Sequence, residues 1–164
     1  MHIENMTINV GGGLPIAGEV LRTLEAQLGE PVQAAATPAL PKIGEPWPGQ
    51  GGIYAGLARG VDGAPDAHLI LATVEAAGLT WGAALEWAKT VEVDGHTDFA
   101  APTRFESALL YANLRDQFDM SAWYWTSTQS SDDYAWYQNF YYGFQYYDNK
   151  SYEGRVRAVR RFIA

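Results

Sequence analysis

The segment YAWYQNFYYGFQYYDNKSY, residues 134–152, constrains the fold of this chain more than any other stretch. Ten of its nineteen residues are aromatic, and no Val, Ile, Leu or Met occurs between Ser121 and Gly154. Protein cores are filled mainly by aliphatic side chains. The members of the doublets Tyr141-Tyr142 and Tyr146-Tyr147 cannot both point inward on one strand. We therefore predict an exposed aromatic patch, which usually marks a binding site.

The composition of residues 132–152 supports the same interpretation. Tyr, Ser, Asn, Asp and Gly dominate this stretch, as they dominate the binding loops of antibodies. Tyr joins a large apolar face to a hydroxyl and has few rotatable bonds, so it adds contact area at low entropic cost. The alternative is a β-sheet with an aromatic core.

Composition also excludes several classes of protein. A formal charge of −8 argues against nucleic-acid binding, although four arginines gather at residues 155–161. The chain has no cysteine, which removes disulfides, thiolate metal sites and Cys nucleophiles. No apolar run approaches the roughly 20 residues that span a membrane, and membrane insertion is not expected. The N-terminal sequence lacks the pattern of a secretory signal.

The positions of Gly and Pro residues divide the chain into three parts. Residues 1–29 read as a short strand and a helix, and we expect an N-terminal attachment or oligomerisation element there. Residues 30–47 are a connector rich in Pro and Ala. Residues 48–164 form the main domain, with the aromatic segment in its C-terminal part, about 123–164.

The main domain reads as an α+β arrangement in the order ββ–α–α–ββββ. GGIYAGLA and HLILAT, joined by VDGAPDA, predict a hairpin. Two helices follow, and the second opens with Thr103 and Glu106 at capping-box spacing. Leu110, Leu114 and Phe118 then form an apolar stripe that predicts a core face. From Ser121 onward the pattern is that of strands.

Residues suited to catalysis or metal binding occur without the partners that such chemistry needs. In DGHTD, His96 lies between Asp94 and Asp98, but a metal site needs further ligands, and a polar loop is favoured. Asp132 and Asp133 are adjacent, so on a strand they point to opposite faces and form no acid/base pair. No enzyme activity, metal or other cofactor is expected.

Four motifs resemble elements of a known fold. HTDFAAPTRFE (96–106) resembles the D-W-R-L-P-T-x-x-E stretch of the formylglycine-generating-enzyme-like branch of the C-type lectin fold, with Phe99-Ala100-Ala101 in place of W-R-L. WYWTST (123–128), AWYQNF (135–140) with Gly143, and RVRAVRRF (155–162) resemble the elements that close that domain. The resemblance implies two helices packed on a mixed, mainly antiparallel sheet, after a short N-terminal βα extension.

Within that branch the chain is most similar to the variable proteins of diversity-generating retroelements, which include phage tail-tip receptor-binding proteins. In that family a reverse transcriptase introduces substitutions at adenines near the 3′ end of the gene. Trp136, Phe140 and Gly143 look like fixed framework. The resemblance assigns ligand binding to positions that adenine changes in an Asn codon can reach. These are Asp132, Asp133, Tyr134, Tyr137, Tyr141, Tyr142, Phe144, Tyr146, Tyr147, Asp148, Ser151 and Tyr152.

The resemblance also implies a function. The expected protein is a hypervariable receptor-binding protein that attaches to a surface protein or glycan of a target cell, in some members as a homotrimer. It would be carried on a phage virion tail or, if chromosomal, lie in the cytoplasm or at the cell surface by a route without a Sec signal. The alternative is a carbohydrate-binding lectin that does not vary. It would be calcium-independent, because the chain lacks the E-P-N and W-N-D triplets that supply calcium ligands in sugar-binding lectins. The enzymes of the branch depend on cysteine, which this chain lacks.

Overall fold

The computed structural model describes residues 39–163. The expected N-terminal element at 1–29, its βα extension and most of the connector at 30–47 lie outside the described residues. The described elements, in chain order, are β1 (Pro46–Trp47), β2 (Gly52–Ala58), β3 (Ala67–Leu79), α2 (Trp81–Lys89), α3 (Arg104–Leu114), the 3-10 turn η1 (Arg115–Gln117), β4 (Trp123–Gln129), β5 (Tyr134–Asn139), β6 (Gln145–Asn149) and β7 (Gly154–Phe162). The predicted ββ–α–α–ββββ order is confirmed, with the short β1 added before it.

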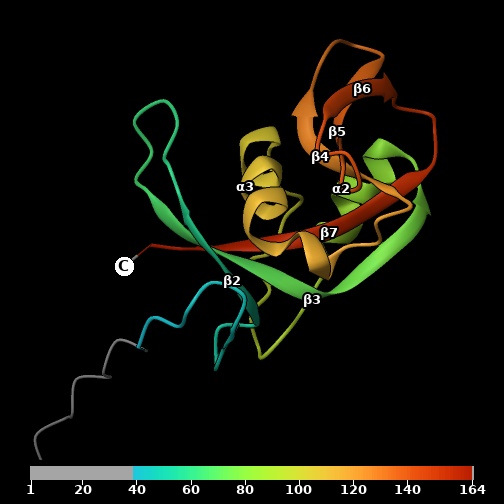
Figure 1. The fold of residues 1–164 in the computed structure, drawn as a ribbon. Coiled ribbons are helices and arrows are strands. Elements are labelled where there is room, and N and C mark those ends of the chain that lie inside the picture. The colour runs from blue at the N-terminus through green and yellow to red at the C-terminus, as the bar shows by residue number, and fades with distance from the viewer. Residues whose placement is uncertain (1–38, 164) are drawn as a thin grey trace, which may run out of the picture. The chain divides into compact units, whose positions relative to one another are not determined.

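All seven strands join one mixed sheet in the order β1-β2-β3-β7-β4-β5-β6. Its neighbours are antiparallel except β4 and β7, which are parallel. The C-terminal strand β7 therefore lies in the middle of the sheet and joins the β2–β3 hairpin to the aromatic strands (Figure 1). Residues 134–152, called the Tyr-rich segment from here on, include strand β6, which is an edge strand.

Strand β1 begins the folded unit earlier than the sequence pattern suggests. Pro46 and Trp47 pair with Ile53 and Gly52 of β2. Trp47 is buried, and its ring meets that of Tyr54 edge-on at a centroid distance of 5.3 Å. The connector predicted to end at residue 47 therefore overlaps this domain. The prolines on either side of Trp47 are typical of a connector, but Trp47 itself belongs to a core cluster.

Strand β3 is longer than its apolar motif HLILAT. It continues to Leu79, although residues 73–78 carry no buried side chain. The extension pairs with β7, with Glu75 opposite Arg157 and Ala76 opposite Val156. This half of β3 is therefore stabilised by pairing with β7 and not by burial of its side chains. The hydrophobic pattern of β3 alone does not reveal such pairing.

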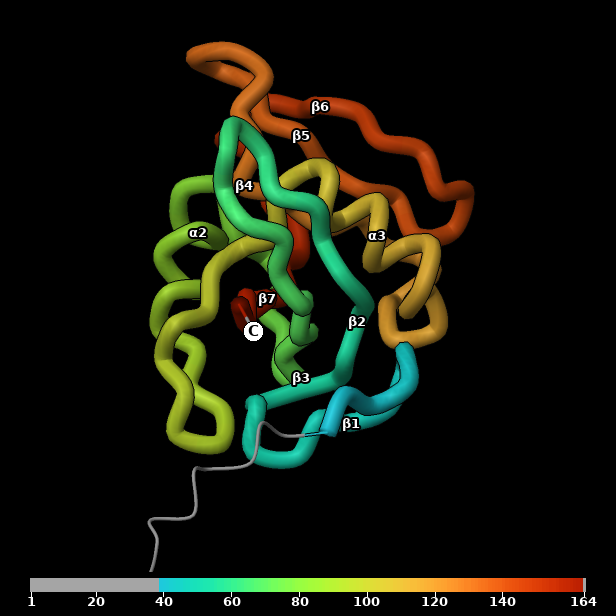
Figure 2. The backbone as a smooth tube through the Cα atoms, turned by 90° about the vertical axis from the view of Figure 1, so that its left-hand side faces the viewer, coloured from blue at the N-terminus to red at the C-terminus, as the bar shows by residue number. Residues whose placement is uncertain are grey.

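The two helices cover opposite faces of the sheet, and Figure 2 shows α2 and α3 on either side of the β3–β7 pair. Helix α2 buries Ala84 and Ala88. Helix α3 begins with the predicted capping box, in which the Thr103 hydroxyl accepts from the N–H of Glu106 at 3.2 Å and the Glu106 carboxylate accepts from the N–H of Thr103 at 2.7 Å. Such a cap stabilises a helix by about 1 kcal/mol.

The core is filled almost entirely by elements other than the Tyr-rich segment. One cluster gathers around Trp125 and Val156 under α2, a second around Leu110 and Val159 under α3, and the third is the small cluster of Trp47. Between residues 130 and 152 the only buried hydrophobic side chains are Ala135 and Phe140. An aromatic core is thereby excluded for most of this segment.

Candidate ligand-binding surface

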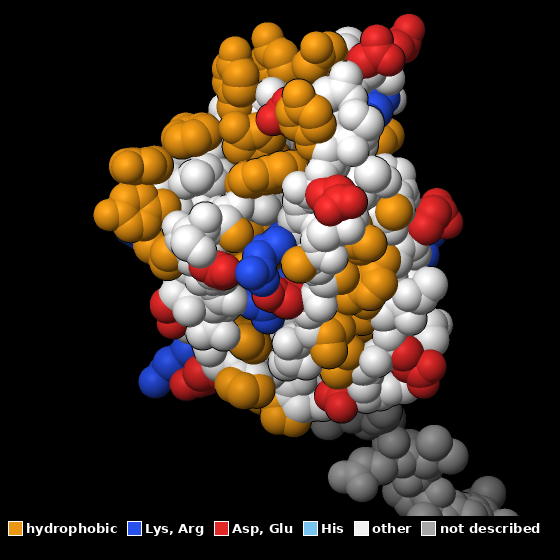
Figure 3. Space-filling model, turned by 90° about the vertical axis from the view of Figure 1, so that its right-hand side faces the viewer, with side chains coloured by type: hydrophobic (Ala, Val, Ile, Leu, Met, Phe, Trp, Pro, Cys, Tyr) orange, Lys and Arg blue, Asp and Glu red, His pale blue; other side chains and the backbone are white. Residues whose placement is uncertain are grey.

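The twelve residues predicted to bind a ligand lie on one β-hairpin and the two loops that flank it. Asp132 and Asp133 are in the loop between β4 and β5, and the remainder follow through β5, the β5–β6 turn, β6 and the loop before β7. Together these twelve are called the hairpin surface. In Figure 3, hydrophobic side chains gather over the upper part of the domain, the end at which Figure 1 places β4, β5 and β6.

Ten of the twelve side chains are exposed, and Tyr137 and Asp148 are half-buried. Tyr142 is the most accessible of the aromatic residues, at 74%. Both members of each tyrosine doublet are exposed, whereas the prediction required only one. Tyr141 and Tyr142 occupy the turn between β5 and β6, and Tyr146 and Tyr147 lie on an edge strand that has a neighbour on one side only.

Six of the seven exposed rings of the hairpin surface contact another ring, and they form two groups. Tyr147 meets Tyr134 and Trp136 edge-on at centroid distances of 5.8 and 5.4 Å, and it stacks on Tyr146 at 4.6 Å. In the second group, Tyr142 meets Tyr141 at 4.6 Å and Phe144 at 6.2 Å. Contacts of this kind restrict each ring before any ligand arrives, which lowers the entropic cost of binding.

The β5–β6 turn is held by two framework residues. The Asn139 side-chain oxygen accepts from the N–H groups of Tyr141 and Tyr142, at 3.0 and 2.8 Å. Gly143 has a φ of +82°, and a β-carbon there would collide with the ring of Tyr111. Gly143 fits the framework role predicted for it. Sequence reasoning missed Asn139, although an Asn before a turn is a known signal for this local bond.

Phe140 anchors the hairpin from below. It is 1% exposed, and its ring stacks on Phe118 with 3.7 Å between centroids and 8° between planes. Tyr124 meets the same ring edge-on at 5.3 Å. The residue lies in the middle of the Tyr-rich run but faces away from the solvent, as its expected framework role requires.

Arg104, at the start of α3, fastens both strands of the hairpin. Its guanidinium carbon lies 3.6 Å from the centroid of the Trp136 ring on β5. Its Nε donates to Gln145 Oε1 on β6 at 2.9 Å, and Gln145 Nε2 donates back to the Arg104 carbonyl oxygen at 2.7 Å. Trp136 is half-buried through this contact. No sequence pattern predicts these roles for Arg104 and Gln145.

Lys150 fastens the loops on the other side of the hairpin. Its Nζ lies 4.6 Å from the centroid of the Trp81 ring on α2 and donates to the carbonyl oxygen of Asp132 at 2.6 Å. Its backbone N–H donates to the carbonyl oxygen of Asp133 at 2.9 Å. The carboxylates of Asp132 and Asp133 are therefore carried on a loop whose backbone is fixed.

Two tyrosine hydroxyls of this surface, those of Tyr137 and Tyr146, have a raised pKa. Burial, followed by the nearby Asp148 and Tyr146, raises the pKa of Tyr137. A hydrogen bond with Tyr147, followed by that residue's charge, raises the pKa of Tyr146. Each hydroxyl can both donate and accept a hydrogen bond, so the surface combines apolar area with adaptable polar contacts.

His96 and Asp98 of the DGHTD loop are bonded to other parts of the domain. His96 Nε2 lies 2.8 Å from the carbonyl oxygen of Gly49, and the Asp98 carboxylate accepts from Arg160 Nε at 2.6 Å. Within residues 39–163 no group of three His, Cys, Asp or Glu side chains is placed to hold a metal ion. The loop DGHTD is thus a polar connection that also holds β7.

The four arginines of the C-terminal strand also have internal partners. Arg155 pairs with Glu75 and Asp119, and Arg161 binds Glu106 through two bonds of 2.6 Å. Arg157 donates to the carbonyl oxygens of Gln117 and Ala72. With Arg160 on Asp98, all four side chains are committed to the domain's own structure.

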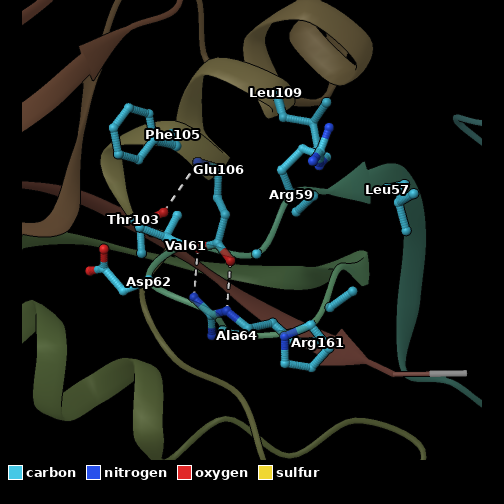
Figure 4. Close-up of a pocket in the computed structure, with 14 residues that line it drawn as sticks. Leu57, Arg59, Val61, Asp62, Ala64, Thr103, Phe105, Glu106, Leu109 and Arg161 are labelled. Atoms are coloured by element: carbon cyan, nitrogen blue, oxygen red, sulfur yellow. Dashed lines mark hydrogen bonds and ion pairs between the residues drawn. The ribbon is translucent and has the colours of Figure 1, made fainter.

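A separate apolar pocket of about 860 Å³ lies between the β2–β3 loop and the start of α3. Leu57, Val61, Phe105 and Leu109 line its walls, and the Glu106–Arg161 ion pair lies against it (Figure 4). Phe105 is 70% exposed. None of the twelve predicted residues lines this pocket, and no sequence motif indicated it.

One family model matches the chain, that of the Lcl C-terminal domain, over residues 60–160. The chain belongs to this family. The match includes the whole hairpin surface and confirms the resemblance to variable proteins of the C-type lectin fold. The Lcl C-terminal domain is a ligand-binding domain of C-type lectin type, and it is not a known enzyme family. No curated protein matches the sequence.

The described helices are α2, α3 and the 3-10 turn η1. None of those in residues 39–163 is long and apolar enough to cross a bilayer.

Proposed function

We propose that this protein is a hypervariable receptor-binding protein, diversified by a retroelement, whose hairpin surface attaches to a molecule on the surface of a target cell. The observation that carries the proposal is the division of roles within one short segment. Ten of the twelve residues assigned to variation are exposed, whereas Phe140 is buried and Gly143 is fixed by its backbone and by Tyr111.

This division suits a surface that changes while its scaffold stays. Exposed side chains away from special contacts usually change stability by no more than about 0.5 kcal/mol when replaced. The hairpin is instead held by Phe140, Asn139, Gly143 and the Arg104–Trp136 contact, all outside the varied set. New side chains at the twelve positions would then alter the ligand and leave the fold intact.

Attachment on a phage tail, in a trimer, would add avidity. Several copies of a weak site bind together far more tightly than one copy, provided that their geometry allows simultaneous contact. The resemblance to tail-tip proteins supports this location and the trimer. Light scattering of the full chain tests the trimer directly, since a monomer has a mass of 18.0 kDa.

Deep sequencing of codons 123–164 across the source population tests the proposal. We expect substitutions at the twelve codons, at adenines of a nearby near-copy, with a reverse transcriptase gene close by. Trp136, Phe140 and Gly143 should not vary. Invariant codons without any near-copy would overturn the retroelement part of the proposal.

A calcium-independent lectin is the second candidate, because exposed aromatic rings such as Tyr142 and Phe144 offer flat faces to sugars. A glycan array run with and without a calcium chelator tests it. Selective binding to one neutral glycan that survives chelation, together with invariant codons, would favour the lectin.

A further inference from the structure

Three cations border the hairpin surface, and each of them is already engaged. Arg104 and Lys150 are held over tryptophan rings and hydrogen-bonded, as described above. Arg115 donates to the carbonyl oxygen of Tyr141 at 3.0 Å, and its guanidinium lies 5.6 Å from the centroid of the Tyr111 ring. These positive charges therefore serve the hairpin's own structure.

The carboxylates of the same surface, unlike these cations, have few or no partners among the described residues. Asp132 and Asp133 are exposed, and within the described part of the chain their side chains have neither a hydrogen bond nor an ion pair. The Asp148 carboxylate accepts only from the neighbouring N–H of Asn149, at 2.8 Å. Glu153, directly after the surface, is also exposed and unpaired among the described residues.

Unpaired carboxylates beside exposed aromatic faces select one kind of partner. The face of a tyrosine ring attracts a cation, and a carboxylate attracts it further. A partner with sulfate or carboxylate groups would meet like charges, which costs free energy at an interface. The whole chain carries a formal charge of −8, which adds to the same preference at long range.

We propose that the hairpin surface recognises a protein surface that presents Lys or Arg side chains, which insert between the tyrosine rings and meet Asp132, Asp133 and Asp148. This inference rests on the proposed function, in which the hairpin surface is the binding site. It selects a cationic protein surface over an acidic glycan as the target. Charge complementarity is the observation that decides between them.

Poly-L-lysine is the probe, with poly-L-glutamate and heparin, a sulfated polysaccharide, as comparators. The full chain is immobilised, and binding is followed by biolayer interferometry. We expect affinity for poly-L-lysine at least about tenfold above that for either comparator, falling as NaCl rises from about 50 to about 300 mM. Tighter binding of heparin would overturn the inference in favour of an acidic glycan.

A matched pair of variants separates local recognition from attraction by net charge. Asp132→Asn with Asp133→Asn removes two charges from the hairpin surface. Glu92→Gln with Asp94→Asn removes two exposed charges from the loop after α2. We expect the first pair to weaken poly-L-lysine binding at least about threefold. The second pair should change it by less than about 1.5-fold. Equal losses would overturn the inference.

The outcome is distinguishable from failure of the proposed function. If poly-L-lysine does not bind, yet the codons for Tyr146 and Tyr147 vary in the population, the variable surface stands and the cationic partner is wrong. If the codons are invariant and poly-L-lysine binds through Asp132 and Asp133, a fixed surface recognises cations and the retroelement is wrong.

Discussion

The guanidinium carbon of Arg104 lies 3.6 Å from the centroid of the Trp136 ring. This contact joins the first residue of α3 to the middle of β5, and Gln145 extends it to β6. Strand β6 of the tyrosine-bearing hairpin lies at the edge of the sheet and has a neighbouring strand on one side only. Its position relative to the core therefore depends on a few contacts of this kind.

Replacement of Arg104 should loosen the hairpin. We expect Arg104→Ala to lower the free energy of unfolding by about 1–2 kcal/mol, because it removes a cation–π contact and a reciprocal pair of side-chain hydrogen bonds. Urea denaturation of the full chain measures the change. Arg59→Ala, which removes an exposed arginine of the β2–β3 loop that pairs with Asp66, is the control and should cost less than about 0.5 kcal/mol. Equal costs would show that Arg104 is not an anchor.

Gly143 should tolerate no side chain. Gly143→Ala forces an alanine to a φ of +82° and drives its β-carbon into Tyr111, and we expect a loss of about 2–4 kcal/mol. Gly63→Ala is a matched control, since Gly63 has a φ of +84° with open space around it. Backbone strain alone should cost that variant about 1 kcal/mol. Thermal unfolding of both proteins gives the comparison, and similar losses would remove the Tyr111 contact as the cause.

Two phenylalanines of the same segment should respond in opposite ways. Phe140 is 1% exposed, so Phe140→Ala should cost about 3–5 kcal/mol of stability. Phe144 is 48% exposed, so Phe144→Ala should cost less than about 1 kcal/mol and act on ligand binding instead. Denaturation midpoints and binding to a target cell are the two measurements. A large stability loss from Phe144→Ala would remove it from the binding set.

Stability should fall at high pH because of Tyr124. Burial raises the pKa of this hydroxyl from 10.0 to about 12. The folded state keeps the proton that the unfolded state loses, so the stabilisation is complete below about pH 10 and disappears as the pH rises toward 12. We expect Tyr124 to contribute up to about 2 kcal/mol to this loss.

Urea midpoints at about pH 8 and about pH 11 check this expectation. Tyr124→Phe starts from a lower stability, because it removes the bonds to Glu75 and Asp119, but it should show a smaller decrease between the two values. Tyr146→Phe, at an exposed position, should retain most of the wild-type decrease. Identical decreases in the wild type and Tyr124→Phe would contradict the assignment.

Local sequence patterns predict the order of the elements and the separation of core from surface. Leu110 and Leu114 repeat at helical spacing behind a capping box, and the hydrophobic pattern that places them is local. The lack of aliphatic residues in the Tyr-rich run, together with its tyrosine doublets, predicted an exposed aromatic patch, because a core needs a supply of aliphatic residues.

The contacts that hold that run in place join residues that are far apart in the sequence and meet only in the folded domain. Arg104 and Gln145 are 41 residues apart, and Lys150 and Trp81 are farther apart still, so neither pairing has a signature in a single sequence. The same holds for Trp47, whose burial depends on Tyr54 and Ile70. Cations that a composition count treats as free are engaged on aromatic rings, and carboxylates are left unpaired. That balance of charge arises from side chains that meet only when the sheet has formed.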